Sequence, residues 1–258
     1  MEKTGNIPGV YNYCDRWCER CPFTSRCASY EHSSVFEAKT AGMGMDAPEF
    51  WEALHQNLSE TVTMVKNMMR EQGLDPDKMI LEDDEAYEEQ RKKTKALMKQ
   101  HPLHQLSNRY SKEALKVIET APQLDEKGDE RLTGTGPAGN TNTPALLRVS
   151  DCMEVVRWYL FFIGSKVARA LNGKLEDDGW ELENGFQRDF DGSAKIAMIA
   201  MERSIAAWAR LLRHFTELED DILPLLVTLQ KMYSLTEQEF PEAKNFIRPG
   251  FDNPNVTE

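Results

Sequence analysis

The stretch TPALLRVSDCMEVVRWYLFFIGSKVARAL, residues 143–171, decides the fold class. Its apolar residues return every three or four positions, which is the repeat of one helix face and not the alternation of a β-strand. Thr143 and Pro144 suit the start of a helix, and Gly173 suits its end. The stretch therefore predicts a long helix with one buried face. That face consists of Leu146, Val149, Met153, Val156, Leu160, Ile163 and Val167.

The same repeat continues on both sides of this stretch. Toward the C-terminus it predicts helices at about 193–217 and 220–234. Toward the N-terminus it predicts helices at about 46–72, 82–100 and 105–121. Alternating strand patterns are scarce. We therefore predict an all-α protein built as a bundle of five or six helices.

Three regions flank or interrupt this predicted bundle. We expect an irregular cysteine-rich arm at residues 1–45, the helical bundle at 46–234, and a loosely packed C-terminal tail at 235–258. Within the bundle, residues 123–144 carry glycine, proline, threonine, asparagine and charged residues with almost no apolar ones. This composition predicts a polar loop.

Composition and charge limit the classes of function. The chain has 258 residues, which is enough to bury a core without disulfides or metals. A formal net charge of −12 argues against nucleic acid as a partner, because phosphate recognition needs a basic surface. The mean hydropathy of −0.58 argues against a membrane protein, and the N-terminus lacks the apolar run of a secretory signal. We expect a cytoplasmic protein that binds neither nucleic acid nor membrane.

Four of the five cysteines lie close together in YCDRWCERCPFTSRC, residues 13–27. A reducing cytoplasm disfavours disulfides and shifts such a cluster toward metal binding. Closely spaced thiolates can converge on one centre at little cost in loop-closure entropy. The sequence therefore predicts a metal site in the arm. Its ligands would be Cys14, Cys18, Cys21 and Cys27, with the spacing Cys-x3-Cys-x2-Cys-x5-Cys.

Two kinds of metal compete for this site. A [4Fe-4S] cluster often takes several cysteines from one compact, irregular segment, as these four are arranged. Structural zinc usually takes two cysteine pairs that a longer loop separates. The spacing therefore favours an iron–sulfur cluster, with zinc as the alternative cofactor.

The first three cysteines also resemble a known pattern. The spacing of Cys14, Cys18 and Cys21 is that of the Cys-x3-Cys-x2-Cys triplet of radical S-adenosylmethionine enzymes, and Cys18-x2-Cys21-x5-Cys27 resembles part of their auxiliary-cluster motif. Those enzymes have β/α barrels and usually an aromatic residue before the third cysteine, whereas this chain has Arg20 there and no strand pattern. The resemblance implies cluster binding and no particular reaction.

Three functions follow from these patterns. The first is a metal-binding helical protein whose iron–sulfur cluster has a redox or sensing role with an unidentified protein or redox partner. The second is an interaction protein with structural zinc. The third is a dimetal-carboxylate enzyme in the bundle, which would use one Glu-x-x-His motif and two further carboxylates. The sequence leaves open whether the chain is an enzyme. The residues of the third candidate are Glu52, His55, Glu154 and Glu202.

Overall fold

The computed structural model describes residues 5–71, 85–120 and 149–252. These ranges contain eight α-helices, three short 3-10 helices and no β-strand. The all-α prediction is therefore confirmed. The predicted polar loop at 123–144 and the last residues of the predicted tail, 253–258, lie outside the described residues.

The chain divides into two compact units. Unit 1 comprises residues 1–90 and 249–258, and unit 2 comprises residues 91–248. The helix α3 (Glu85–Gln100) crosses the boundary between the two ranges. This division differs from the predicted boundary at residue 46, because the first long helix, α2 (Pro48–Glu71), falls in unit 1 with the cysteine-rich arm.

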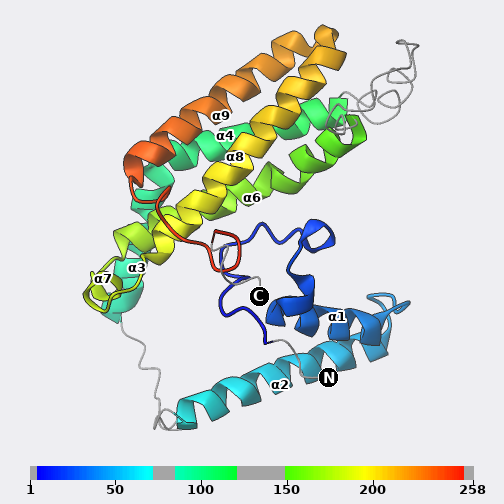
Figure 1. The fold of residues 1–258 in the computed structure, drawn as a ribbon, viewed down its shortest axis with the longest axis vertical. Helices are drawn as coiled ribbons and strands as arrows, with labels where there is room; N and C mark the ends of the chain where they lie inside the picture. Colours follow the sequence, from blue (N-terminus) through cyan, green and yellow to red (C-terminus); the bar gives the residue numbers. More distant parts are fainter. Residues whose placement is uncertain (1–4, 72–84, 121–148, 253–258) are drawn as a thin grey trace. The chain divides into compact units, whose positions relative to one another are not determined.

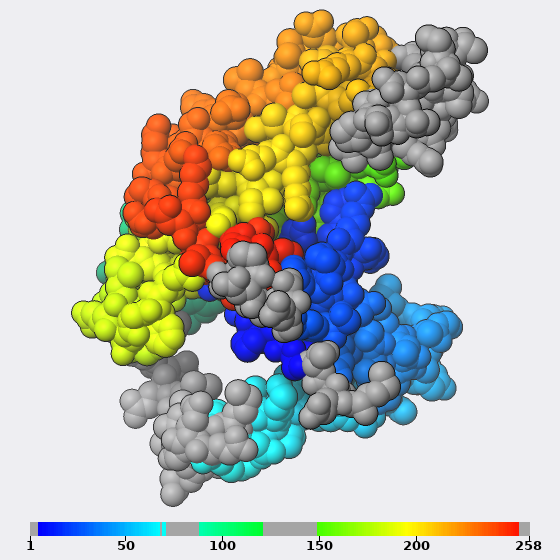
Figure 2. All heavy atoms as spheres, in the orientation of Figure 1, coloured from blue at the N-terminus to red at the C-terminus, as the bar shows by residue number. Residues whose placement is uncertain are grey.

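Unit 2 is built around four long helices (Figure 1). These helices are α4 (Pro102–Thr120), α6 (Val149–Leu175), α8 (Asp189–His214) and α9 (Glu219–Glu239). Each of them packs against two others, and the contact between α6 and α8 is the most extensive. The spheres of α8, in yellow, and α9, in orange, lie side by side in Figure 2. The bundle prediction is confirmed for these helices.

The core of unit 2 follows the predicted helical repeat. Every described residue of the apolar face predicted on α6 is buried. On α8, small buried residues such as Ala194, Ala197 and Ala200 face the interior, so neighbouring helices can approach closely. The indole Nε1–H of Trp208 donates to the Tyr110 hydroxyl over 3.1 Å, and both side chains are fully buried. Helix α4 is thereby tied to α8.

Two segments of unit 2 differ from the prediction. Helix α9 continues past residue 234 to Glu239, and a packed segment follows it instead of a loose tail. In that segment Phe240, Ala243 and Phe246 are buried. A four-residue helix, α7 (Trp180–Glu183), was also not predicted, and it lies in the connection between α6 and α8. Together these segments form the walls of a cavity that is described below.

Unit 1 has a different character. It contains the 3-10 helices η1 (Cys18–Arg20) and η2 (Thr24–Arg26), the helix α1 (Ala28–Thr40) and α2. Helix α1 was not predicted, because it has no buried residue and hence no apolar stripe. Helix α2 has the predicted stripe, but several of its apolar residues are exposed. These exposed residues are Trp51, Leu58, Val62 and Val65.

Within the described residues, no helix is long and apolar enough to cross a bilayer.

Candidate metal centre

The four cysteines of the arm lie on a series of tight turns in unit 1. Cys18 opens η1, and the backbone N–H of Cys21 donates back to the Cys18 carbonyl over 3.1 Å. The N–H of Cys27 donates to the Thr24 carbonyl over 3.4 Å, and α1 starts at the next residue. Short turns of this kind keep thiols that are close in sequence close in space.

The turn between the first two cysteines contains an unusual backbone conformation. Arg16 has φ of +60°, in the left-handed region that residues other than glycine rarely adopt. Next to it, the Trp17 N–H donates to the Asp15 carboxylate over 3.2 Å, as in an Asx-turn. The left-handed residue reverses the chain between Cys14 and Cys18.

All four cysteines of the arm line one small cavity. Each of the four cysteines is partly buried, and none forms a disulfide. The cavity has a volume of about 20 Å³, which is room for little more than one water molecule. The structure thus places around one cavity all four cysteines that the sequence predicted as metal ligands. Its other lining residues are Val10, Tyr11, Asp15, Arg16, Trp17, Phe23, Thr24, Tyr30 and Phe251.

Sequence reasoning missed the contribution of the C-terminal segment to this cavity. The ring of Phe251 meets the ring of Phe23 edge to face, with 4.9 Å between centroids. Gly250 allows this approach, because its φ is +78° and a Cβ there would lie 3.2 Å from Val10 Cγ2 and 3.3 Å from Ile7 Cδ1. The sequence signal for this contact was the Pro-Gly-Phe at residues 249–251. It lies in the region that we predicted as a loosely packed tail.

The surroundings of Cys18 and Cys21 disfavour the thiolate forms of these two residues. Burial raises the pKa of Cys18, and the neighbouring Cys14, Cys21 and Cys27 raise it further. Burial also raises the pKa of Cys21, although the Phe23 N–H, which donates to the Cys21 sulfur over 3.4 Å, lowers it. A nucleophilic or redox-active cysteine normally has a lowered pKa. These thiols therefore lack the activation that dithiol catalysis needs.

The donor set and its geometry can be compared with the needs of a metal. Four thiolates form a soft ligand set that suits iron–sulfur clusters or zinc. Among the described residues, however, no three His, Cys, Asp or Glu side chains stand in an arrangement that could hold a metal ion. The Cys14 thiol, for example, donates to the Tyr11 carbonyl over 3.5 Å. Metal binding would therefore require thiol side chains to rotate toward the cavity centre.

The residues of the dimetal alternative do not point into a helical core. Glu52 and His55 are exposed on α2, in unit 1. Glu154 on α6 and Glu202 on α8 are exposed in unit 2. A dimetal-carboxylate site needs inward-facing ligands in the bundle interior. The structure therefore gives this alternative no support.

Comparison with known proteins adds no family to these observations. No family model, no curated protein and no solved structure matches the chain. The function is therefore argued from the site itself.

Proposed function

We propose that Cys14, Cys18, Cys21 and Cys27 hold a [4Fe-4S] cluster, and that the protein has a redox or sensing role. The observation that carries this proposal is that four cysteines, closely spaced in sequence, line one cavity in unit 1. When bound, such a cluster supplies one-electron chemistry at a potential that its surroundings set.

The weak core of unit 1 supports a bound metal. Among the described residues of this unit, only three apolar side chains are buried, those of Ile7, Val10 and Ala53. A unit of this size with so little buried apolar area usually needs a metal or disulfides for stability. Metal–thiolate bonds would connect four points of the arm and supply the missing stabilisation.

The surroundings of the thiols favour iron–sulfur over other centres. All four cysteines come from one irregular segment, and aromatic rings line the cavity around them. The N–H that Phe23 donates to the Cys21 sulfur is the kind of contact that tunes the potential of a cluster. Arg16 and Arg20 are exposed beside the site, so an acidic surface on a protein redox partner is the expected complement.

The proposal can be tested by spectroscopy on the anaerobically purified chain. We expect a brown protein with broad absorbance near about 400 nm. Cys21→Ala should lose this absorbance, whereas Cys152→Ala should keep it, because Cys152 is buried in α6 and belongs to unit 2. Colourless wild-type protein after reconstitution with iron and sulfide would overturn the iron–sulfur assignment.

One observation favours zinc as a second candidate. The cavity of about 20 Å³ has room for a single ion and not for the eight-atom core of a cubane unless the arm opens. In this case the site would be structural, and the protein would act through interactions with a partner. Colourless protein that retains about one zinc per chain, and loses it in Cys21→Ala, would support this candidate.

A further inference from the structure

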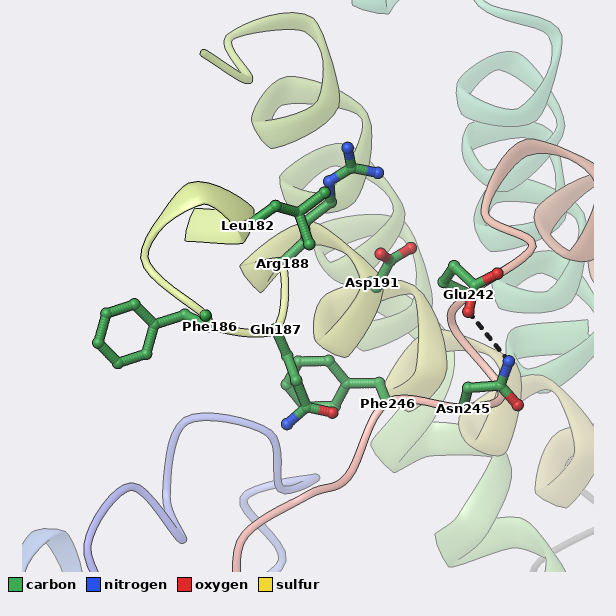
Figure 3. A pocket seen from close by; sticks show the side chains of 9 residues that line it. Leu182, Phe186, Gln187, Arg188, Asp191, Glu242, Asn245 and Phe246 are labelled. Carbon is green, nitrogen blue, oxygen red and sulfur yellow. Dashed lines mark hydrogen bonds between the residues drawn. The ribbon is translucent and has the colours of Figure 1, made fainter. Parts of the chain in front are cut away.

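A second cavity lies wholly within unit 2, apart from the cysteine site. It has a volume of about 380 Å³, in the range of pockets that bind small molecules. It lies among the short helix α7, the loop that follows it, the first turn of α8 and the packed segment after α9 (Figure 3). Its lining residues are Leu182, Gly185, Phe186, Gln187, Arg188, Asp191, Glu242, Asn245 and Phe246.

The walls of this cavity are held together by hydrogen bonds. The Gln187 side chain accepts from the Ile247 N–H over 2.6 Å and donates to the Ile247 carbonyl over 3.1 Å. From α8, the Lys195 ammonium donates to the Phe246 carbonyl over 2.5 Å. These bonds fix the segment after α9 against the start of α8, so the cavity is preformed.

One charged side chain inside this cavity has no partner. Asp191 is 5% exposed, yet within the described residues its carboxylate accepts no hydrogen bond and forms no ion pair within 4 Å. In Figure 3 this carboxylate lies between Arg188 and Glu242. A carboxylate that faces a cavity without a protein partner is a candidate ligand-binding group.

The charges around Asp191 favour a single cation as that ligand. The groups that influence it are Arg188, Glu242, Lys174 and Asp177. Two of these groups are cations and two are carboxylates, and both cations already have carboxylate partners. Arg188 is itself held 3.5 Å from Asp177, and Lys174 is hydrogen-bonded to Glu239 over 2.8 Å, so neither cation pairs with Asp191.

The other residues that line the cavity indicate the chemical character of the ligand that carries this cation. Leu182 and Phe246 give the cavity apolar and aromatic surface, and aromatic faces attract cations, whereas the ring of Phe186 points away from the cavity in Figure 3. Glu242 can accept a further hydrogen bond, since Asn245 donates to only one of its oxygens, over 3.0 Å. A bare metal ion fits poorly, because the described residues offer no set of three metal ligands here.

We propose that this cavity binds a small primary amine with an apolar body, whose ammonium group pairs with Asp191 and Glu242. The ammonium would supply the charge and the hydrogen-bond donors that the Asp191 carboxylate lacks. The apolar part would lie against Leu182 and Phe246. This site is independent of the cysteine site.

The test compares 2-phenylethylamine with its uncharged analogue 2-phenylethanol, by calorimetric titration of the full chain at about pH 7.5. We expect the amine to bind at least about tenfold more tightly than the alcohol. The amine should also bind more weakly below about pH 6, where Asp191 takes up a proton. Equal binding of the two probes, or no binding of the amine at about 10 mM, would overturn the proposal.

Substitutions then test whether Asp191 recognises the amine. Asp191→Asn should weaken amine binding by about tenfold or more, and Glu242→Gln by a few-fold. The matched control is Asp220→Asn, because Asp220 is exposed in the first turn of α9 and does not line the cavity. This control should bind the amine as the wild type does. Equal affinities in Asp191→Asn and Asp220→Asn would contradict the assignment, and circular dichroism would establish that both variants are folded.

Discussion

The hydrogen bond between Tyr110 and Trp208 is the most deeply buried polar contact between side chains described above, and it joins residues 98 positions apart. Burial raises the pKa of Tyr110 to about 12, so the phenol stays protonated at all ordinary pH values. Tyr110→Phe removes the acceptor and leaves the Trp208 N–H buried without a partner. We expect a loss of about 1–3 kcal/mol in the free energy of unfolding, measured with urea.

A double-mutant cycle with Trp208→Phe separates this bond from packing. If the bond stabilises the core, the double variant should lose less than the sum of the two single variants, with a coupling of at least about 0.5 kcal/mol. Strict additivity would show that Tyr110 and Trp208 contribute through packing alone.

A second prediction at the residue scale concerns the effect of Asp191 on the stability of the protein. Burial raises the pKa of its carboxyl from 3.8 to about 6, against the opposing effect of Arg188. The folded protein therefore holds a proton at Asp191 more readily than the unfolded chain. The stability that this group contributes is fully present below about pH 4 and is lost as the pH rises through about 6.

Asp191→Asn should therefore stabilise the protein at neutral pH. We expect the free energy of unfolding at about pH 7.5 to rise by about 1–2 kcal/mol, a discounted figure because the carboxylate still reaches the open cavity. The gain should vanish near pH 4, where the wild-type carboxyl is protonated. Thermal melts at the two pH values measure this difference, and a gain that is the same at both would contradict the assigned titration.

Single residues of the candidate sites were predictable to different degrees. The four cysteines could be named from spacing alone, because ligands that lie close in sequence need little help from the fold. Phe251 could not be named in this way. Its contact with Phe23 depends on how the fold brings together two segments that are far apart in the sequence. Asp191 was also missed, because an aspartate in the first turn of a helix is usually explained by the helix dipole.

At the scale of elements, the packing of the segment 249–252 on the arm can be tested by a substitution at Gly250. Gly250→Ala imposes a left-handed alanine and places its Cβ against Val10 and Ile7. We expect the packing of the segment on the arm to weaken by more than the backbone cost of about 1–2 kcal/mol. Hydrogen exchange of the Ile7 N–H, which donates to the Arg26 carbonyl over 2.9 Å, would report the loosening.

Gly42→Ala is the matched control for this experiment. Gly42 has φ of +79°, and a Cβ there would meet nothing within 4 Å. The control therefore has the same backbone strain without the contact. Similar exchange of the Ile7 N–H in the two variants would contradict the role given to the C-terminal segment.

The positions of the helices could be predicted from the local repeat of apolar residues. The burial of those residues could not. The long helices of unit 2 follow from apolar residues three and four positions apart, which the chain displays without knowledge of its neighbours. The stripe of α2 gave the helix correctly, but Trp51 is 56% exposed, since a stripe does not specify its partner. On α9, Val227 is exposed although its polar neighbour Thr228 is buried, so hydrophobicity alone does not identify the buried positions.

At the scale of the whole molecule, the apolar core is unevenly divided. The length of the chain suggested that no metal was needed for folding, and this holds for unit 2, which contains nearly all of the buried apolar residues described. The described part of unit 1 buries only three apolar side chains, so chain length gives no such assurance for this unit. Chain length alone could not reveal this division.

If the arm holds a metal as proposed, removal of the metal should affect the two units differently. We expect chelation, or Cys21→Ala, to raise hydrogen exchange throughout residues 5–27 while the helices α4, α6, α8 and α9 keep their protection. The far-ultraviolet circular dichroism should change little, because most helical residues belong to unit 2. Cooperative loss of the whole helical signal would contradict the self-sufficiency of the bundle.

The central claim is that the arm holds an iron–sulfur cluster. The most direct measurement is the amount of iron, acid-labile sulfide and zinc per chain in protein purified without oxygen. We expect about four iron and four sulfide per wild-type chain, the same in Cys152→Ala, and neither in Cys21→Ala. Wild-type protein with no sulfide, whether it holds one zinc or no metal, would contradict this claim.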